Sequence, residues 1–233
     1  MNASNEWSTS QAAKATICRI VYRHRIPLNT LCYYMPILHT RLFVTLTTRQ
    51  SRIVNMNTIK LLDIRPGSQI LEIGFGFGDT SIRLCLKYLG TSHNEGCYHG
   101  LEKNDLMVLH ASDEYRDQIN KGRVVIKEGS PDQNLNEYEA NYFDVCFGVY
   151  VFWFLQERRT SLLEIHRVLK QNGRCVFAVR VYGQSKLTRG SAAERVDLNA
   201  LEEEFREVGF ETHFRWEVGW SISDTLYIIA HKQ

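Results

Sequence analysis

The sequence predicts an α/β protein whose central sheet is doubly wound and mostly parallel, with helices on both faces. Short apolar runs typical of buried strands alternate with amphipathic helical stretches along most of the chain. A glycine-rich turn joins the first expected strand to the helix after it, and the last two strands are close enough in sequence to pair antiparallel. These observations favour a parallel sheet with one antiparallel member at its end.

The composition favours one domain of ordinary size plus an extension. The chain has 233 residues, of which 44% are hydrophobic and 11% aromatic, so it can bury a sizeable core. Its net charge is +2, but residues 1–62 carry +7 and the remainder carries −5. The six cysteines show no C-x-x-C pair and no zinc pattern, so we expect reduced thiols, a cytoplasmic setting and no metal. No apolar run reaches the ~18 residues of a membrane span.

Residues 1–50 contain a single acidic residue, and their arginines are interleaved with aliphatic and aromatic side chains. Pro27 and Pro36 exclude one long helix. Three interpretations remain open: a cap of short helices over a ligand cleft, a mitochondrial transit peptide, and a tail without function. Apolar residues dilute the basic ones too much to favour nucleic-acid binding. We therefore divide the chain into a basic extension or cap, 1–50, and a main domain, 51–233.

Turn signals and hydrophobic periodicity place the elements of the main domain in order. A helix over 53–63 is expected to lead into the Pro66-Gly67 turn. The expected strands cover 70–73, 98–101, 124–126, 143–149, 175–179, 211–218 and 225–230. Three further helices have a clear end: one from Asp79 to Gly90, one that begins before Leu162 and ends at Asn172-Gly173, and one from Asp197 to Gly209. Another helix is expected to begin near Asp105, with Leu106 and Leu109 inward.

The chain is organised around residues 69–80, in which a strand, a glycine turn and a helix N-terminus follow one another. Gly74, Gly76 and Gly78 alternate over five residues. Glycine permits positive φ and has no side chain, so a ligand can lie directly on the backbone. The N–H groups of the following helix then face that ligand. The stretch therefore predicts a nucleotide-type site.

The glycine spacing indicates which nucleotide this is. The dinucleotide fingerprint is Gly-x-Gly-x-x-Gly, whereas this chain has Gly-x-Gly-x-Gly with Glu72 two residues before the first glycine. A carboxylate there would repel a pyrophosphate but suits an ammonium group. The stretch closely resembles motif I of the class I S-adenosylmethionine-dependent methyltransferases. The block from Phe143-Asp144-Val145 to Glu164-Ile165-His166-Arg167-Val168-Leu169-Lys170-Gln171-Asn172-Gly173 resembles the small-molecule, type-11 branch of that family.

The resemblance covers about residues 53–231. It implies a Rossmann-like fold of seven strands in the order 3-2-1-4-5-7-6, with the last strand pair antiparallel, and S-adenosyl-L-methionine as cofactor. Glu102 ends the second strand, where a carboxylate can accept both ribose hydroxyls. The residues expected to bind the cofactor are Glu72, Gly74, Gly76, Gly78, Thr80, Glu102, Lys103, Met107, Gly129, Ser130, Gly148 and Val149. Ser130 stands where the family often has an aspartate at the adenine amino group, and Asp132 is a possible substitute.

Aromatic residues after two strand ends form the expected acceptor pocket: Tyr150, Trp153 and Tyr182. Their faces would favour a cationic group, although the residues from Phe152 to Phe154 could equally belong to the core. Methyl transfer mainly requires that the nucleophile be aligned with the sulfur–carbon bond and that water be excluded. No motif identifies a catalytic base, and His166 is expected to be structural.

The sequence leaves three functions open. Methyl transfer to a small molecule agrees best with the motifs, and the DNA amino methylases are disfavoured because residues 148–151 lack their Asn/Asp-Pro-Pro-Tyr/Phe motif. A nicotinamide oxidoreductase is suggested by Tyr182 and Lys186, but the glycine spacing is wrong and Leu169 stands where a serine is needed. The third is a non-catalytic cofactor-binding or scaffolding protein, since fold alone does not establish activity. The oligomeric state is not predicted.

Overall fold

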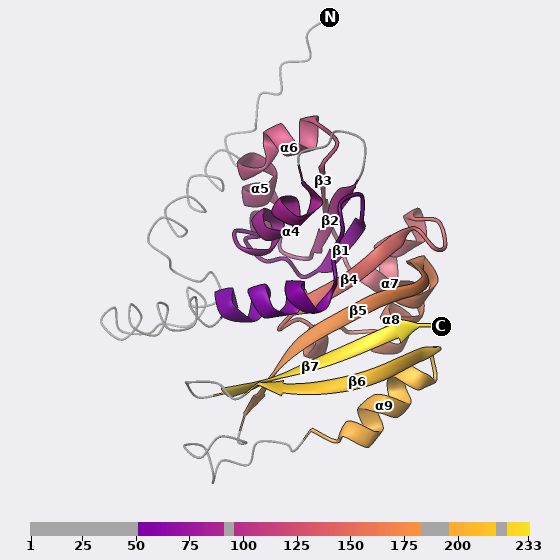
Figure 1. Cartoon of the computed structure of the whole chain (residues 1–233). Coiled ribbons are helices and arrows are strands. Elements are labelled where there is room, and N and C mark those ends of the chain that lie inside the picture. The colour runs from indigo at the N-terminus through magenta and orange to yellow at the C-terminus, as the bar shows by residue number, and fades with distance from the viewer. Residues whose placement is uncertain (1–50, 91–95, 183–195, 218–222) are drawn as a thin grey trace, which may run out of the picture.

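The computed structural model describes residues 51–90, 96–182, 196–217 and 223–233. Their centre is a seven-stranded sheet in the order β3-β2-β1-β4-β5-β7-β6 (Figure 1). Strands β1 to β5 pair in parallel, and β7 runs antiparallel to both β5 and β6. The predicted fold class, strand order and antiparallel ending are therefore confirmed. The expected cap, residues 1–50, lies outside the described residues.

The bounds of the elements follow the predicted alternation. The strands are β1 Gln69–Ile73, β2 Cys97–Glu102, β3 Val124–Glu128, β4 Phe143–Val149, β5 Leu169–Tyr182, β6 Phe210–Glu217 and β7 Ser223–Lys232. The α-helices are a first helix over 51–61, α4 Ser81–Leu89, α5 Asp105–Glu114, α6 Arg116–Asn120, α7 Pro131–Asn134, α8 Arg158–Val168 and α9 Leu198–Arg206. Two short 3₁₀ helices, η1 Leu135–Glu137 and η2 Phe152–Phe154, complete the described chain.

The core consists of two apolar clusters, one on each face of the sheet. One cluster joins α8 and α9 to the sheet through fully buried residues such as Leu162 and Phe205. The other joins the first helix and α4 to the opposite face, through Ile59 and Ile82 among others. Burial of both sheet faces explains why the strands are continuous apolar runs. Within the described residues, no helix is long and apolar enough to cross a membrane.

The N-termini of α4 and α5 differ from those expected from the sequence. Asp79 was predicted to cap α4, but the residue before the helix is Thr80, which makes no side-chain cap. The Asp79 carboxylate instead lies 3.8 Å from Nε2 of His110 on α5. Asn104 caps α5, and the residues that α5 buries are His110 and Ala111 rather than the expected leucines. The contact between Asp79 and α5 has overridden the local capping preference.

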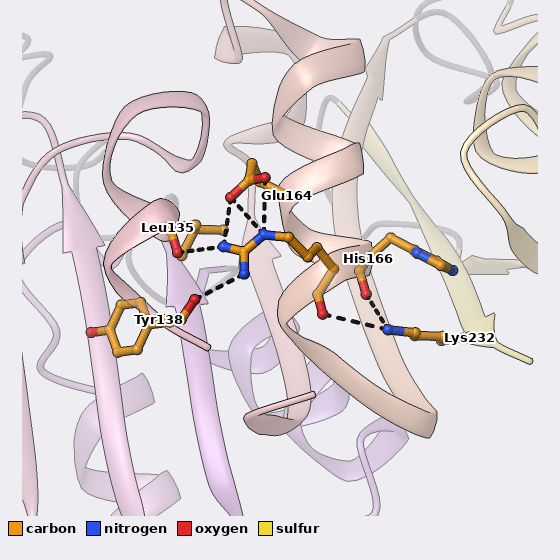
Figure 2. A network of polar contacts seen from close by, with 6 residues as sticks. Leu135, Tyr138, Glu164, His166 and Lys232 are labelled. Carbon is orange, nitrogen blue, oxygen red and sulfur yellow. Dashed lines mark hydrogen bonds and ion pairs between the residues drawn. The ribbon is translucent and has the colours of Figure 1, made fainter. Parts of the chain in front are cut away.

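Helix α8 ends at Val168, four residues before the predicted stop at Asn172, because its carbonyls have partners from a distant strand. The ammonium of Lys232, near the chain's end on β7, donates to the carbonyl oxygen of His166 at 2.8 Å (Figure 2). The same ammonium donates to the carbonyl oxygen of Leu169 at 2.7 Å. It also donates to Oδ1 of Asn141 at 3.0 Å. These bonds satisfy carbonyls that a helix end leaves without intrahelical partners, so the chain turns into β5 early.

The neighbouring residues Glu164, His166 and Arg167 of α8 have structural roles. The Arg167 guanidinium donates to the carbonyl oxygens of Leu135 at 2.8 Å and Tyr138 at 2.9 Å, and pairs with Glu164 at 2.7 Å (Figure 2). His166 packs edge-on against Phe210, with 4.9 Å between ring centroids, which agrees with its expected structural role. Arg167, held by Glu164, thus fastens α8 to η1.

Candidate cofactor and acceptor site

The glycine loop leaves the carboxyl end of β1 with all three glycines in the left-handed region. Their φ angles are 70°, 58° and 71° at Gly74, Gly76 and Gly78. A Cβ at Gly74 would lie 2.6 Å from Cγ2 of Val151, and one at Gly78 would lie 2.4 Å from Cδ1 of Ile82, whereas Gly76 has nothing within 4 Å. The outer glycines are therefore required by packing, and the middle one presents bare backbone to open space.

Glu102 is fastened to that middle glycine. It ends β2, which pairs in parallel with β1, so its side chain lies at the same edge of the sheet as the loop. Its Oε2 accepts a hydrogen bond from the Gly76 N–H at 2.9 Å, and its Oε1 accepts one from the Asn104 N–H at 3.0 Å. Each carboxylate oxygen retains a second lone pair. The arrangement can therefore accept two further hydroxyl donors without releasing the loop.

Glu72 is buried rather than displayed, with 2% of its surface exposed. The Tyr98 hydroxyl donates to its Oε2 at 2.6 Å. Burial raises the pKa of Glu72 to about 8, although hydrogen bonds from Tyr98 and Ser81 act in the opposite direction. At neutral pH the structure thus holds a mainly protonated acid where the sequence suggested a negative charge. Its part in cofactor binding stays a prediction.

The end of β3 supplies a buried hydroxyl beside Glu102. The Gly129 N–H donates to the Glu102 carbonyl oxygen at 3.0 Å, which joins the two strand ends. Ser130 is 3% exposed; its N–H donates to Oδ1 of Asn134, but within the described chain its Oγ has no hydrogen-bond partner. An orphaned buried hydroxyl is costly unless a ligand or water satisfies it. Ser130 therefore fits the polar edge of an adenine, and Asp132 lies half-buried two residues further along the chain.

Three other predicted cofactor residues, Met107, Lys103 and Thr80, make fewer contacts with the glycine loop and Glu102. Met107 is half-buried in the first turn of α5, where its N–H is capped by Asn104. Lys103 is exposed, and its ammonium reaches Oε1 of Gln156 at 3.4 Å. Thr80 is half-buried at the start of α4. These three residues border the site without a contact that fixes a role.

Across from the glycine loop, β4 ends at Gly148 and Val149. Gly148 is buried, and a Cβ there would lie 2.6 Å from Cγ1 of Val151 and 2.9 Å from the Phe177 ring. Since Gly74 meets the same valine, the two glycines let the loop and the end of β4 approach closely. Tyr150 follows at once, half-buried and with a φ of 60°.

The expected acceptor residues Trp153 and Tyr182 lie in different environments, and the aromatic neighbours of Trp153 differ in burial. Phe152 is fully buried in the core, whereas Trp153 is 42% and Phe154 is 76% exposed. The Arg158 guanidinium lies over the Trp153 ring, 5.8 Å from its centroid. Tyr182 is the last residue of β5, opposite Ser223 of β7, and its side chain lies outside the described part of the structure.

Sequence reasoning missed two residues at this edge. Asn104 caps α5 and shares the Glu102 carboxylate with the glycine loop. Arg180, near the carboxyl end of β5, lies over the Tyr150 ring with its Cζ 4.3 Å from the centroid. The available signal for Arg180 was a single basic residue within the otherwise apolar run of residues 175–182.

A seven-stranded sheet in this order, with an antiparallel last pair and a glycine loop at the carboxyl end of β1, defines the class I methyltransferase fold. Residues 71–177 match the family model described as "Methyltransferase domain", of the type-11 branch. These residues, just under half of the chain, are therefore a domain of that family of S-adenosylmethionine-dependent methyltransferases. No curated protein matches the sequence closely.

Solved structures agree with this fold. A SAM-dependent methyltransferase from Aquifex aeolicus superposes with a TM-score of 0.62 at 16% identity, covering 80% of this chain and 93% of that one. Phosphoethanolamine N-methyltransferase 2 of Haemonchus contortus, solved with phosphomonomethylethanolamine and S-adenosylhomocysteine, gives 0.61 at 15% identity, covering 77% and 52%. The [4+2]-cyclase SpnF gives 0.63 at 16% identity, covering 96% of each chain. At such identities these likenesses establish the fold alone.

Proposed function

We propose that this chain transfers a methyl group from S-adenosylmethionine to a small-molecule acceptor by in-line displacement. The observation that carries the proposal is the hydrogen bond between Gly76 and Glu102, which unites the glycine loop and a ribose-binding carboxylate at one edge of the sheet. The unpartnered hydroxyl of Ser130 extends this edge toward an adenine. The end of β4 at Gly148 faces the same loop and would close the methionine side.

When bound, S-adenosylmethionine supplies a methyl carbon activated by a sulfonium, so that its S–C bond breaks as the acceptor–C bond forms and S-adenosylhomocysteine leaves. The chain's contribution is to hold the cofactor and align the acceptor with that bond. Glu102 and the Gly76 backbone would hold the ribose, and Ser130 would contact the adenine. We assign no catalytic base, because a base is needed only if the acceptor must lose a proton.

We propose that the acceptor pocket lies beyond the ends of β4 and β5 and includes Tyr150, Trp153 and Tyr182. The Haemonchus enzyme, whose structure contains a small phosphorylated amine, supports a small-molecule acceptor for this fold. We further propose that residues 1–50 cap this pocket, because their many apolar and aromatic side chains suit a cover better than a nucleic-acid arm. Residues 51–233 then form the cofactor-binding domain.

The cap proposal is tested by deleting residues 1–50. The truncated protein should bind S-adenosylmethionine with unchanged affinity and lose turnover of any acceptor that the full chain methylates. Full turnover by the truncated protein would contradict the cap. Salt-sensitive, sub-micromolar binding of the full chain to generic DNA or RNA would instead indicate a nucleic-acid arm.

A second candidate function is a cofactor-binding protein without methyl transfer. The observation that favours it is that a cyclase shares this fold at a TM-score of 0.63 over 96% of the chain. Binding of S-adenosylmethionine does not separate the two candidates, so the test is production of S-adenosylhomocysteine on a panel of small acceptors. Acceptor-dependent production supports the methyltransferase. Tight cofactor binding without production on amine, hydroxyl, thiol and carboxylate acceptors supports the alternative.

A further inference from the structure

The glycine loop is held from one side, by β2 and by the helix α5 that follows it. The Gly74 N–H donates to the carbonyl oxygen of Leu101, within β2, at 2.7 Å. The Gly76 N–H donates to the carboxylate of Glu102, the last residue of β2, at 2.9 Å. Two of the three loop glycines are therefore fixed by hydrogen bonds to the end of one strand.

Tyr115 holds the third glycine from the opposite end of α5. It is the residue directly after that helix and is 6% exposed, and its hydroxyl donates to the carbonyl oxygen of Gly78 at 3.2 Å. Burial raises the pKa of Tyr115 to about 12, so at neutral pH the hydroxyl keeps the proton that it donates. Helix α5 is thus connected to the loop at both ends, through Glu102 before it and Tyr115 after it.

The middle of α5 contacts the residues on either side of Gly78. The ring of His110 packs edge-on against Phe77, with 5.5 Å between ring centroids, and its Nε2 lies 3.8 Å from Oδ1 of Asp79. Residues 76–79 therefore each contact the segment 102–115. Contacts at four successive positions restrict the conformations that a loop can adopt, and such preorganisation raises the affinity for a ligand that binds the loop.

The Tyr115 hydroxyl is not required to satisfy the Gly78 carbonyl. The same carbonyl oxygen also accepts a hydrogen bond from the Ile82 N–H, in the first turn of α4, at 3.1 Å. Removal of the hydroxyl would therefore leave the carbonyl with one hydrogen bond, which is enough for a buried carbonyl oxygen. What the hydroxyl adds is a second direction of attachment, from α5, which orients the loop against Glu102.

We infer that Tyr115 is a positioning residue for the cofactor: its hydroxyl holds Gly78, and through it the Gly76 backbone, in the orientation that the ligand needs. No contact between Tyr115 and the ligand is required. Without the hydroxyl, a fraction of the molecules has the loop in other conformations, and the apparent affinity falls with the competent fraction. The inference rests on the proposed function, because the roles of Gly76 and Glu102 in cofactor binding belong to it.

The test compares the whole chain with Tyr115→Phe and with a matched control, Tyr138→Phe. Each change removes one tyrosine hydroxyl and leaves its ring in an apolar cluster. The Tyr138 hydroxyl lies 3.1 Å from Nδ1 of His99, and its ring packs on the cluster at the opposite face of the sheet from Tyr115. Calorimetric titration with S-adenosylmethionine and with S-adenosylhomocysteine gives the Kd and the stoichiometry separately, and urea unfolding without ligand gives the stability of each protein.

We expect Tyr115→Phe to raise the Kd of both ligands by about 3- to 10-fold at unchanged stoichiometry, and Tyr138→Phe to leave both Kd values within about twofold. A merely structural tyrosine would instead lower the folded fraction, and hence the stoichiometry, without changing the Kd. An unchanged Kd in folded Tyr115→Phe, or an equal rise of Kd in both variants, would overturn the inference.

Turnover separates failure of this inference from failure of the proposed function. With an acceptor that the unaltered protein methylates, Tyr115→Phe should raise KM for S-adenosylmethionine by the same factor and leave kcat and the acceptor's KM within about twofold. A lower kcat at unchanged KM would contradict the positioning role. If S-adenosylmethionine binds but no acceptor is methylated, methyl transfer fails, and the Kd comparison alone decides the role of Tyr115. Absence of cofactor binding by the unaltered protein overturns both.

Discussion

The Glu102 carboxylate accepts a hydrogen bond from the backbone N–H of Gly76 at 2.9 Å, across 26 positions of sequence. This bond joins the acid that ends β2 to the only glycine of the loop whose added Cβ would meet nothing within 4 Å. One side chain therefore positions the loop and also presents acceptors toward the ligand. Loss of Glu102 should consequently affect the cofactor more than the fold.

The first prediction is that Glu102→Ala weakens binding of S-adenosylmethionine by about 30- to 150-fold, or about 2–3 kcal/mol. Glu102→Gln should lose less, because its amide oxygen can still accept from one of the two backbone donors. S-adenosylhomocysteine has the same ribose, so its affinity should fall by a similar factor. Binding isotherms for both ligands provide the measurement. A loss confined to S-adenosylmethionine would show that Glu102 senses the sulfonium charge instead.

The second prediction concerns Glu72, whose pKa is raised from 4.5 to about 8 by burial. Between these values the folded chain retains a proton that the unfolded chain releases. Stability from this group is therefore present below about pH 4.5 and falls as pH rises toward 8, by up to about 1.4 kcal/mol per pH unit. Glu72→Gln should remove that slope.

Urea unfolding of both proteins from pH 5 to pH 8 measures the difference. His99, whose pKa burial lowers to about 4, contributes a slope of opposite sign between about pH 4 and 6.5, but it is common to both proteins and cancels. A stability difference that does not change with pH would contradict the shifted pKa of Glu72.

The third prediction is that Lys232→Met destabilises the fold by about 2–4 kcal/mol. The change leaves the carbonyl oxygens of His166 and Leu169 without the hydrogen bonds that the buried ammonium donates to them. The matched control is Lys121→Met, which alters an exposed lysine at the turn before β3 and should cost under about 0.5 kcal/mol. Chemical unfolding compares them, and equal losses would mean that the network in Figure 2 contributes little.

Much of this architecture could be predicted because its signals are local. The glycine loop, the apolar strands and the position of Glu102 at a strand end all follow from neighbouring residues. The early end of α8 could not be predicted, because it depends on Lys232, 63 residues beyond Leu169. The approach of Arg180 to Tyr150 depends likewise on the register between β4 and β5. The protonation of Glu72 depends on burial, which a sequence motif does not report.

We expect the cofactor to lie on the bare backbone of Gly76, and Gly122 provides a matched control. Both glycines have positive φ, 58° and 69°, and a Cβ on either would meet nothing within 4 Å. Alanine at each should therefore cost a similar, small amount of stability, about 1–2 kcal/mol. Gly122 lies at the turn before β3, apart from the cofactor loop. Only the Gly76 variant should lose cofactor affinity.

The most direct measurement is a calorimetric titration of S-adenosylmethionine into the unaltered protein, Gly76→Ala and Gly122→Ala, with NADH as the comparison ligand. We predict binding of S-adenosylmethionine and not NADH, a loss of about tenfold or more in Gly76→Ala, and no change in Gly122→Ala. Unchanged affinity in a folded Gly76→Ala protein, or an equal loss in both variants, would contradict the assignment of the cofactor site.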